Sequence, residues 1–540
     1  MPRMTGGQAL VEILAAHGVE TVFGMPGSHS LAIYDALAAG SAIRHISIRH
    51  EQGAAFMADG YARSTGKVGV CITTTGPAAL NTLGALSTSY TDSCPVMLLC
   101  TQVPRDYIGK DKGIYHEIPD QLGMLERITK FAARPNNPQE IVDLVREAYR
   151  QALDGRPRPV ALELPADILN EEGDVTILAP APLSPKQPTS EDIEAARRLI
   201  VDAKRPVVWV GGGVVSSGAS AELAQFVELI QAPVLSTTLA KGALPGDHPL
   251  ELGFLAVKQP VQEYLATCDL VIAIGTRFSY ISTERWTIPL PKRMIHIDID
   301  ESVIGRNYPV TLGVAADARE SLRALVGQLR DAQGSAPRES RTDEVRELKD
   351  AVHADWKQEI PRDYRILQRI REVLPRNAII SGDPTMCMYL AWRMLDAYEP
   401  RGFLYPMACA TLGYGYPAAL GAKLAHPDRP VVAICGDGGF MLSCQEMATA
   451  AQYGINVVVL LFNDDGFEVL RIQQDDRFGR RSEVDLKNPD FVAMAQSFGV
   501  DGVRVDDVDR LGAVIETALG NNRPTLIEIP LAIGADTITA

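Results

Sequence analysis

Short hydrophobic runs that end in glycine recur along the chain, and each is followed by a stretch with helical spacing. Four examples are VGVCITTTGP (68–77), RPVVWVGGG (205–213), CDLVIAIGTRF (268–278) and PVVAICGDGGF (430–440). A run that is apolar on both faces is typical of a buried parallel strand, and parallel strands are joined by crossover helices. The pattern therefore predicts an α/β protein with doubly wound parallel sheets.

Two stretches interrupt this alternation. One (EEGDVTILAPAPLSPKQPTS) is rich in proline, and the other (DAQGSAPRESR) is polar and rich in small side chains. Segments of this kind rarely belong to a core. We therefore expect three α/β domains joined by two linkers. The expected domains cover residues 1–170, 191–330 and 360–540, and the expected linkers cover residues 171–190 and 331–359.

Composition narrows the class of protein. The chain has 540 residues, 46% of them hydrophobic, and a formal net charge of −15. An acidic chain has no electrostatic reason to bind nucleic acid or an anionic membrane. The longest apolar stretches, such as 457–462, are too short to cross a bilayer, and residues 1–7 lack the pattern of a secretory signal. The eight cysteines form no CxxC pair, so we expect a cytoplasmic protein with reduced thiols.

The most distinctive local motif is Gly436-Asp437-Gly438-Gly439, which lies between a buried strand and a helix. Glycines let the backbone approach a ligand closely, and the amides at a helix start attract a diphosphate. An aspartate at this point would repel a bare anion, but Mg²⁺ can bridge a carboxylate to phosphates. A structural turn explains this motif equally well when the motif is considered alone.

A second acidic loop strengthens the metal interpretation. The apolar run 455–462 ends in Asn463-Asp464-Asp465-Gly466, and 27 residues separate Asp437 from Asp464. That length fits a βαβ unit, which places the carboxyl ends of two parallel strands side by side. Ligands of open α/β sheets bind at this edge. We therefore expect the two acidic loops to converge.

The first block contains a glutamate that opens a helix after a strand, in ISIRHEQGAAFMADGYAR (46–63). Considered alone, Glu51 is more simply a first-turn helix charge than a catalytic group.

Taken together, these segments resemble a known family. The GDG motif, its spacing and the Asn-containing turn are similar to the thiamine diphosphate signature. HEQGAAFMADGYAR (50–63), TTTGPAALN (73–81), IHIDID (295–300) and LGYGYPAALGAKLA (412–425) resemble segments of acetolactate synthase-like enzymes, and YHEIPDQ (115–121) also resembles 2-oxo acid decarboxylases. The resemblance extends over nearly the whole chain. It implies pyrimidine-binding, middle and diphosphate-binding domains, in this order.

The resemblance also implies roles for particular residues. Mg²⁺ would be held by Asp437, by Asp464, where the family usually has asparagine, and by the carbonyl of Gly466. Glu51 would hydrogen-bond the cofactor pyrimidine and so promote loss of the thiamine C2 proton. The other implied cofactor contacts are Asn81, Leu412, which would support the bent cofactor, Gly436, Gly438 and Gly439.

The substrate pocket departs from that of biosynthetic acetohydroxyacid synthases. Their Asp-Asp-Arg cluster is replaced in GTRFSYISTERW (275–286), their tryptophan by Gln473, and Phe-Gln-Glu by Tyr115-His116-Glu117. We expect decarboxylation of a 2-oxo acid with carboligation, as in acetolactate synthase. The alternative is simple decarboxylation of a bulky or cationic 2-oxo acid such as 2-ketoarginine, with Glu117 and Asp120 as acidic contacts. His116 is a candidate catalytic group, and a surface turn histidine is the plainer interpretation.

Three further questions follow from the resemblance. FAD binding is open, because Gly211–Gly213 and Arg277 permit it whereas the changed segment that follows weakens the case. A non-catalytic cofactor-binding subunit would lack Glu51 or Asp437, and an NAD-dependent oxidoreductase would need a GxGxxG motif that the chain does not contain. The family builds each site between two subunits, which implies a homodimer or homotetramer acting on a small 2-oxo acid.

Overall fold

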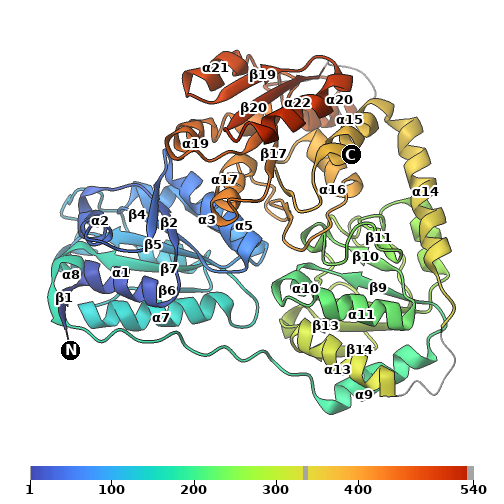
Figure 1. Cartoon of the computed structure of the whole chain (residues 1–540). Coiled ribbons are helices and arrows are strands. Elements are labelled where there is room, and N and C mark those ends of the chain that lie inside the picture. Colours follow the sequence, from blue (N-terminus) through green and yellow to red (C-terminus); the bar gives the residue numbers. More distant parts are fainter. Residues whose placement is uncertain (1, 332–337, 532–540) are drawn as a thin grey trace.

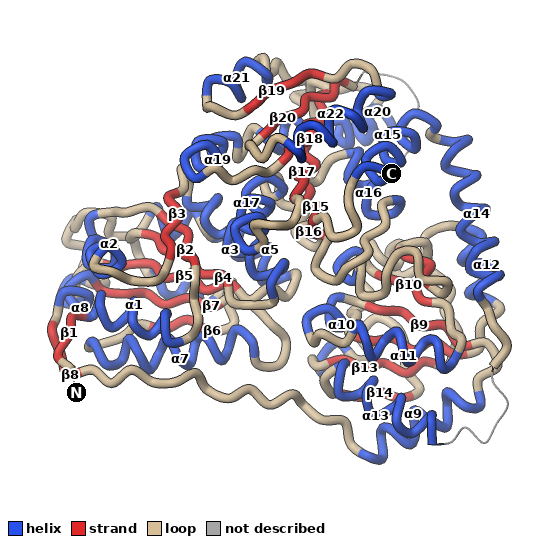
Figure 2. Tube along the Cα trace, in the orientation of Figure 1, coloured by secondary structure: helices blue, strands red, loops and turns tan. Residues whose placement is uncertain are grey.

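The computed structural model describes residues 2–331 and 338–531. It contains three six-stranded parallel sheets with helices packed around each of them (Figures 1 and 2). The predicted fold class is thereby confirmed. Residues 332–337, in the expected second linker, and residues 532–540, at the end of the expected third domain, lie outside the described part of the chain.

In the first domain, helices cover a buried parallel sheet. The strands of this sheet have the order β3-β2-β4-β5-β7-β6. The strands are β2 (Thr21–Gly24), β3 (Arg44–Ser47), β4 (Gly69–Thr73), β5 (Val96–Gln102), β6 (Phe131–Ala133) and β7 (Val160–Pro165). The helices are α1 (Gly6–Ala16), α2 (Leu31–Ala38), α3 (Glu51–Thr65), α4 (Pro77–Asn81), α5 (Leu83–Thr91), α6 (Gln121–Glu126), α7 (Pro138–Leu153) and α8 (Ala166–Asn170).

The middle domain has the sheet order β11-β10-β9-β12-β13-β14. Its strands are β9 (Pro206–Val210), β10 (Val234–Ser236), β11 (Glu251–Gly253), β12 (Leu270–Ile274), β13 (Met294–Asp298) and β14 (Leu312–Ala315). Its helices are α9 (Ser190–Asp202), α10 (Gly212–Ser216), α11 (Ser220–Ile230), α12 (Gln259–Ala266) and α13 (Ala318–Asp331).

The third domain has the sheet order β16-β15-β17-β18-β20-β19. Its strands are β15 (Ile379–Gly382), β16 (Phe403–Leu404), β17 (Val431–Gly436), β18 (Val458–Asn463), β19 (Asp501–Arg504) and β20 (Thr525–Pro530). Its helices are α15 (Pro361–Val373), α16 (Met386–Met394), α17 (Gly415–Ala425), α18 (Asp437–Phe440), α19 (Met447–Tyr453), α20 (Glu468–Phe478), α21 (Phe491–Ser497) and α22 (Val508–Gly520).

The structure shows secondary structure in both expected linkers. Residues 342–359 of the second expected linker form helix α14 (Thr342–Glu359), which runs from the middle to the third domain (Figure 1). Val345, Val352 and Trp356 lie on its buried face, so the segment belongs to the core. At the first linker, β8 (Glu172–Asp174) pairs antiparallel with β1 (Arg3–Thr5). This short polar edge strand has no apolar alternation by which the sequence could predict it.

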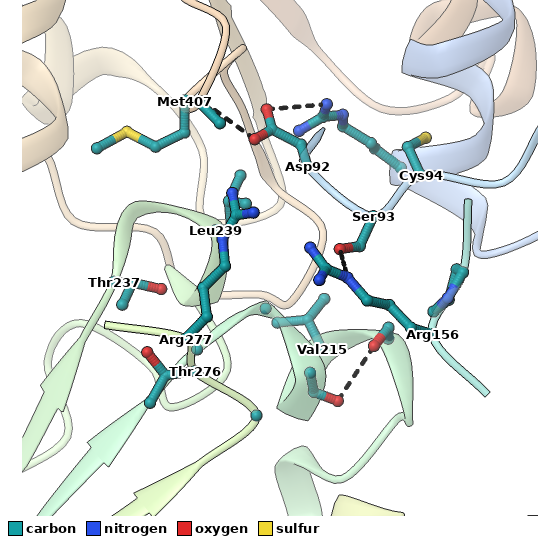
Figure 3. A pocket seen from close by; sticks show the side chains of 18 of the residues that line it. Asp92, Ser93, Cys94, Arg156, Val215, Thr237, Leu239, Thr276, Arg277 and Met407 are labelled. Carbon is teal, nitrogen blue, oxygen red and sulfur yellow. Dashed lines mark hydrogen bonds and ion pairs between the residues drawn. The ribbon is translucent and has the colours of Figure 1, made fainter. Parts of the chain in front are cut away.

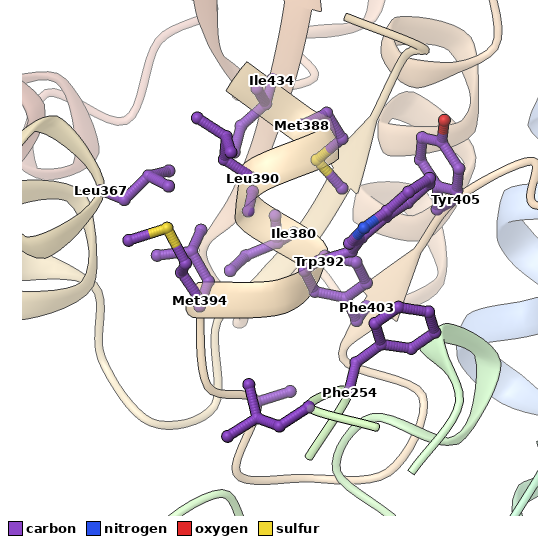
Figure 4. Packing of buried hydrophobic residues seen from close by; sticks show 14 of the residues in the cluster. Phe254, Leu367, Ile380, Met388, Leu390, Trp392, Met394, Phe403, Tyr405 and Ile434 are labelled. Atoms are coloured by element: carbon purple, nitrogen blue, oxygen red, sulfur yellow. The ribbon is translucent and has the colours of Figure 1, made fainter. Parts of the chain in front are cut away.

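The domains share hydrophobic cores as well as chain connections. Figure 4 shows Phe254 of the middle domain beside Trp392 and Phe403 of the third, and the Phe254 and Trp392 rings lie 6.2 Å apart. The first and third domains pack through α3 and α17, where a Cβ on Gly60 would lie 2.0 Å from the Ala418 carbonyl oxygen. None of the helices in the described residues is long and apolar enough to cross a membrane.

Candidate active site

The two acidic loops of the third domain meet at one edge of its sheet. Strands β17 and β18 are parallel neighbours, with Gly436 paired to Phe462. Asp437 therefore opens α18 beside the loop that Asp464 begins. The backbone N–H of Gly466 donates to Asp437 Oδ2 at 3.0 Å, and the charge of Asp437 acts on Asp464, so the two acidic loops converge.

Arg471 is the cation nearest the Asp464 carboxylate among the described residues, with its Nη1 4.0 Å from Asp464 Oδ1. Asp464 Oδ1 is buried and has no hydrogen-bond partner among the described residues. Burial, together with the charges of Asp437 and Glu468, raises the pKa of Asp464 to about 7. Burial also raises the pKa of Asp437, although Asn488 opposes this shift. A divalent cation would compensate both carboxylates, so the residues present fit Mg²⁺.

Two glycines of the expected diphosphate turn have close neighbours. A Cβ on Gly438 would lie 2.5 Å from Phe467 Cε1, and a Cβ on Gly439 would lie 2.8 Å from Asp383 Oδ2. No cluster of three His, Cys, Asp or Glu side chains suited to a metal occurs among the described residues. A metal here would therefore depend on two carboxylates plus backbone oxygen, as the sequence predicts.

Two residues at the acidic loops were not predicted. Arg471 of α20 is 1% exposed, and its guanidinium donates to the carbonyl oxygens of Asp464, at 2.8 Å, and Asp465. Asn488 donates from Nδ2 to Asp437 Oδ2 at 2.6 Å. Arg471 holds the backbone of one loop, and Asn488 holds the carboxylate of the other. Their spacing from the GDG motif carries no periodic pattern, so the sequence gives no sign of either role.

Glu51 is the first residue of α3, in the first domain. Asn81, at the end of α4, donates from Nδ2 to Glu51 Oε2 at 2.9 Å, so these two predicted residues are in contact. Glu446 of the third domain accepts hydrogen bonds from the N–H groups of Arg49, at 3.1 Å, and His50, at 3.0 Å. This buried carboxylate fixes the start of α3, and it too was not predicted. Glu51 makes no hydrogen bond or ion pair with Asp437 or Asp464 in the described part of the chain.

Leu412 lies in the loop before α17 and is partly exposed. Its neighbour Gly413 has φ +81°, a left-handed conformation that favours glycine. Thr411 Oγ1 lies 2.7 Å from Thr88 Oγ1 of α5, which ties the loop to the first domain. The loop is thus held between the domains that carry Glu51 and Asp437.

The segment that replaces Phe-Gln-Glu has a distinct geometry. His116 has φ +65°, its ring stacks on Tyr115 with centroids 3.9 Å apart, and its Nδ1 is buried without a partner among the described residues. Glu117 Oε2 accepts from the N–H of Ile114 at 3.0 Å, and its Oε1 is also buried without a partner there. Asp120 accepts from the N–H of Gly123 at 3.1 Å and caps α6, so this predicted substrate contact has a structural role.

A separate cavity of about 600 Å³ lies between the three domains. Its walls include Gly211–Gly213 at the start of α10, and Figure 3 shows Arg156 and Arg277 on opposite sides of its interior. Burial and the neighbouring Arg156 lower the pKa of Arg277. Asp298 also lines the cavity, and burial raises its pKa to about 6. The two guanidinium groups make the cavity suitable for an anionic ligand.

Comparison with known proteins agrees with this geometry. Residues 4–124, 193–325 and 383–529 match the N-terminal TPP binding, central and C-terminal TPP binding domains of thiamine pyrophosphate enzymes. A probable 2-ketoarginine decarboxylase of Pseudomonas aeruginosa is 38% identical over 97% of this chain and 94% of its own length. A probable acetolactate synthase large subunit of Methanocaldococcus jannaschii is also 38% identical, over 97% of this chain and 92% of its own length. The acetolactate synthase isozyme 3 large subunit of Escherichia coli is 31% identical over 98% of this chain and 95% of its own length. The chain therefore belongs to the thiamine pyrophosphate enzymes.

Proposed function

We propose that this protein decarboxylates a 2-oxo acid and joins the remaining fragment to a carbonyl acceptor, with thiamine diphosphate and Mg²⁺ as cofactors. The observation that carries the proposal is the buried Asp464 Oδ1 beside Asp437, which has no hydrogen-bond partner among the described residues and lies 4.0 Å from Arg471 Nη1, at the edge of the sheet where ligands bind. A buried carboxylate oxygen without a hydrogen bond is costly unless a cation contacts it directly. The relatives named as acetolactate synthases support the carboligase activity.

The chain's own residues divide the work between two domains. Asp437, Asp464 and the carbonyl of Gly466 hold the metal, and the backbone of the Gly436–Gly439 turn holds the diphosphate. When bound, thiamine diphosphate supplies a carbon nucleophile and accepts the negative charge that remains after CO₂ leaves. Glu51, held by Asn81, keeps a proton at the pyrimidine ring.

Two further predicted residues contact the cofactor and the substrate. Leu412 supports the cofactor from the interdomain loop, and His116 contacts the substrate. The buried, unpartnered Nδ1 of His116 is available for such a contact.

The site is completed between two subunits, so the protein is a homodimer or homotetramer. Large apolar side chains are exposed on the third domain, among them Leu442 at 52% and Phe478 at 68%. Such surfaces mark interfaces between proteins. Light scattering during dilution tests this, and a fully active monomer would contradict it.

Product analysis tests the reaction. Purified protein with thiamine diphosphate and Mg²⁺ is given pyruvate, alone and with an acceptor aldehyde. Acetolactate and mixed hydroxyketones are the expected products, whereas acetaldehyde alone would indicate a simple decarboxylase. If no 2-oxo acid is consumed by protein that binds the cofactor, the proposed function is wrong.

A second candidate is decarboxylation of a cationic 2-oxo acid. The specific observation is the buried, unpartnered Glu117 Oε1, which could receive a guanidinium group. The relative named as a 2-ketoarginine decarboxylase supports the same substrate class. Turnover of 2-ketoarginine that falls sharply in Glu117→Gln would establish it, and absence of turnover would reject it.

We also infer that the interdomain cavity holds a nucleotide cofactor, with FAD as the first candidate. Arg156 and Arg277 provide two cationic groups for phosphates, and the cavity volume of about 600 Å³ is that of a cofactor site. Flavin absorbance of the purified protein, and the nucleotide released on denaturation, test this inference. A colourless protein that releases no nucleotide would contradict it.

We further infer a reducing, cytoplasmic location. All eight cysteines are free, and six of them are buried. Free thiols in this number are typical of proteins that fold in a reducing compartment. Cell fractionation tests this inference.

A further inference from the structure

His29 lies at the same edge of the first sheet as Glu51. Strands β3, β2 and β4 are neighbours in that sheet, and their carboxyl ends are followed by Glu51, His29 and Thr75. Adjacent strands are about 4.8 Å apart, so the three loops lie within roughly 10 Å of one another. His29 is thus close to the carboxylate that serves the cofactor.

The ring of His29 is held from one side. Its Nδ1 lies 2.8 Å from Thr75 Oγ1, and Thr75 Oγ1 lies 3.0 Å from Thr101 Oγ1, which is buried. If Thr101 donates to Thr75, Thr75 donates in turn to His29 Nδ1. The imidazole then carries its proton on Nε2, which makes no hydrogen bond with the described residues.

The other groups that face His29 keep it uncharged. The His116 ring lies 6.0 Å away and the Tyr115 ring 6.4 Å away, both edge-on. Burial and the charge of His116 lower the pKa of His29. A neutral imidazole with Nε2–H is a hydrogen-bond donor that stays fixed near neutral pH.

We propose that His29 is a further catalytic residue whose neutral Nε2–H donates a hydrogen bond to the 2-oxo oxygen of the substrate, with Thr75 holding the required tautomer. The proposal rests on the proposed function. Negative charge gathers on that oxygen when the oxo carbon is attacked. A preorganised donor therefore stabilises the oxygen more strongly in the transition state than in the bound substrate. No proton leaves the imidazole.

Steady-state kinetics of the holoenzyme test the donor. In His29→Asn the amide still reaches Thr75 but nothing replaces Nε2–H. With the 2-oxo acid that wild-type enzyme consumes, we expect kcat and kcat/KM to fall together by about 100-fold. The affinity for thiamine diphosphate, measured by fluorescence quenching, should remain unchanged. His248→Asn, in the middle domain, is the matched control and should leave turnover unchanged.

The tautomer gives a readout that does not depend on turnover. We expect ¹⁵N NMR of histidine-labelled holoenzyme to show His29 protonated at Nε2, assigned by its loss in His29→Asn. Thr75→Val should mix the tautomers and lower kcat, and Thr75→Ser should restore both. His116→Asn should raise the pKa of His29, because the interaction with His116 lowers it.

Three outcomes separate the possible errors. An active wild-type enzyme whose His29→Asn variant keeps its rate within twofold would overturn the role of His29 alone. Protonation of His29 at Nδ1 in the wild-type protein would also overturn it. A wild-type protein that consumes no 2-oxo acid would instead overturn the proposed function on which the inference depends.

Discussion

The first and third domains have the same sheet topology, whereas the middle domain does not. Counted within each domain, the strand order is 2-1-3-4-6-5 in the first and third sheets and 3-2-1-4-5-6 in the middle sheet. The shared order brings corresponding loops to the same edge. After the first strand of the sheet stands His29 in one domain and Asp383 in the other, and after the third strand stand Thr75 and Asp437. Topology therefore decides where the loops meet, and side chains decide what they bind.

The two edges differ most in charge. In the third domain, burial raises the pKa values of Asp383 and Asp437, and no ion pair with an arginine is found for either carboxylate among the described residues. In the first domain, burial lowers the pKa of His29, and the loop around Thr75 is uncharged. One edge therefore suits a cation with its phosphates, and the other suits a neutral ring. The two halves of thiamine diphosphate have these two characters.

The largest expected effect comes from removing the Glu51 carboxylate at the edge of the first sheet. Glu51→Gln keeps a side chain that can contact Asn81 but cannot take up a proton. We expect kcat to fall by about 1,000-fold while the protein still folds and binds the cofactor, because acid–base groups contribute about 10²–10⁴. Circular dichroism and cofactor titration serve as controls. A rate near that of the wild type would remove the distinction between the two edges.

The packing of the two domains gives the next largest effect. A Cβ on Gly60 would lie 2.0 Å from the Ala418 carbonyl oxygen, so Gly60→Ala must push α3 away from α17. Overpacking of this kind costs about 1–3 kcal/mol. The free energy of unfolding in urea should fall by that amount. Gly84→Ala is the matched control, because a Cβ there meets nothing within 4 Å.

Much of this arrangement could be predicted from sequence, and the limits have physical causes. The apolar runs predict the strands, and the 27-residue spacing predicts that the Asp437 and Asp464 loops meet. Both predictions use hydrophobic patterns within short segments, which reflect local structure. Arg471, Asn488 and Glu446 were missed because each acts across the fold, through contacts that no spacing encodes. Helix α14 was not predicted, although its buried residues have helical spacing. Most of its residues are polar or charged, so the segment resembled a linker.

A smaller effect should follow from replacing Asp464, at the sheet edge of the third domain, by the asparagine that is more usual in the family. Asp464→Asn keeps an oxygen that can bind Mg²⁺ but removes one negative charge. We expect the affinity for Mg²⁺, measured by calorimetry with thiamine diphosphate present, to fall about 10-fold. Without metal, the variant should unfold at a higher temperature than wild type, since the repulsion from Asp437 is gone. An unchanged affinity would show that the extra charge of this chain does not strengthen its metal site.

The smallest effect concerns Asp383, which occupies the position of His29 in the third domain. Its Oδ1 accepts from the N–H of Gly415 at 2.8 Å, and its Oδ2 is buried without a partner among the described residues. Burial raises its pKa to about 7, from an ordinary value of 3.8. The folded state therefore keeps a proton that the unfolded chain releases above its ordinary pKa. The contribution of this group to stability is complete at low pH and is lost as the pH rises toward 7.

Asp383→Asn retains an acceptor for Gly415 and cannot ionise. Its stability relative to wild type should increase between about pH 4 and pH 7 and then level off. We expect a gain on the order of 1 kcal/mol at pH 8, since the new amide must also find a partner. Urea unfolding of the cofactor-free protein at several pH values measures the difference. A difference that is constant with pH would mean that Asp383 ionises normally, and the charge contrast between the two edges would then rest on Asp437 and Asp464 alone.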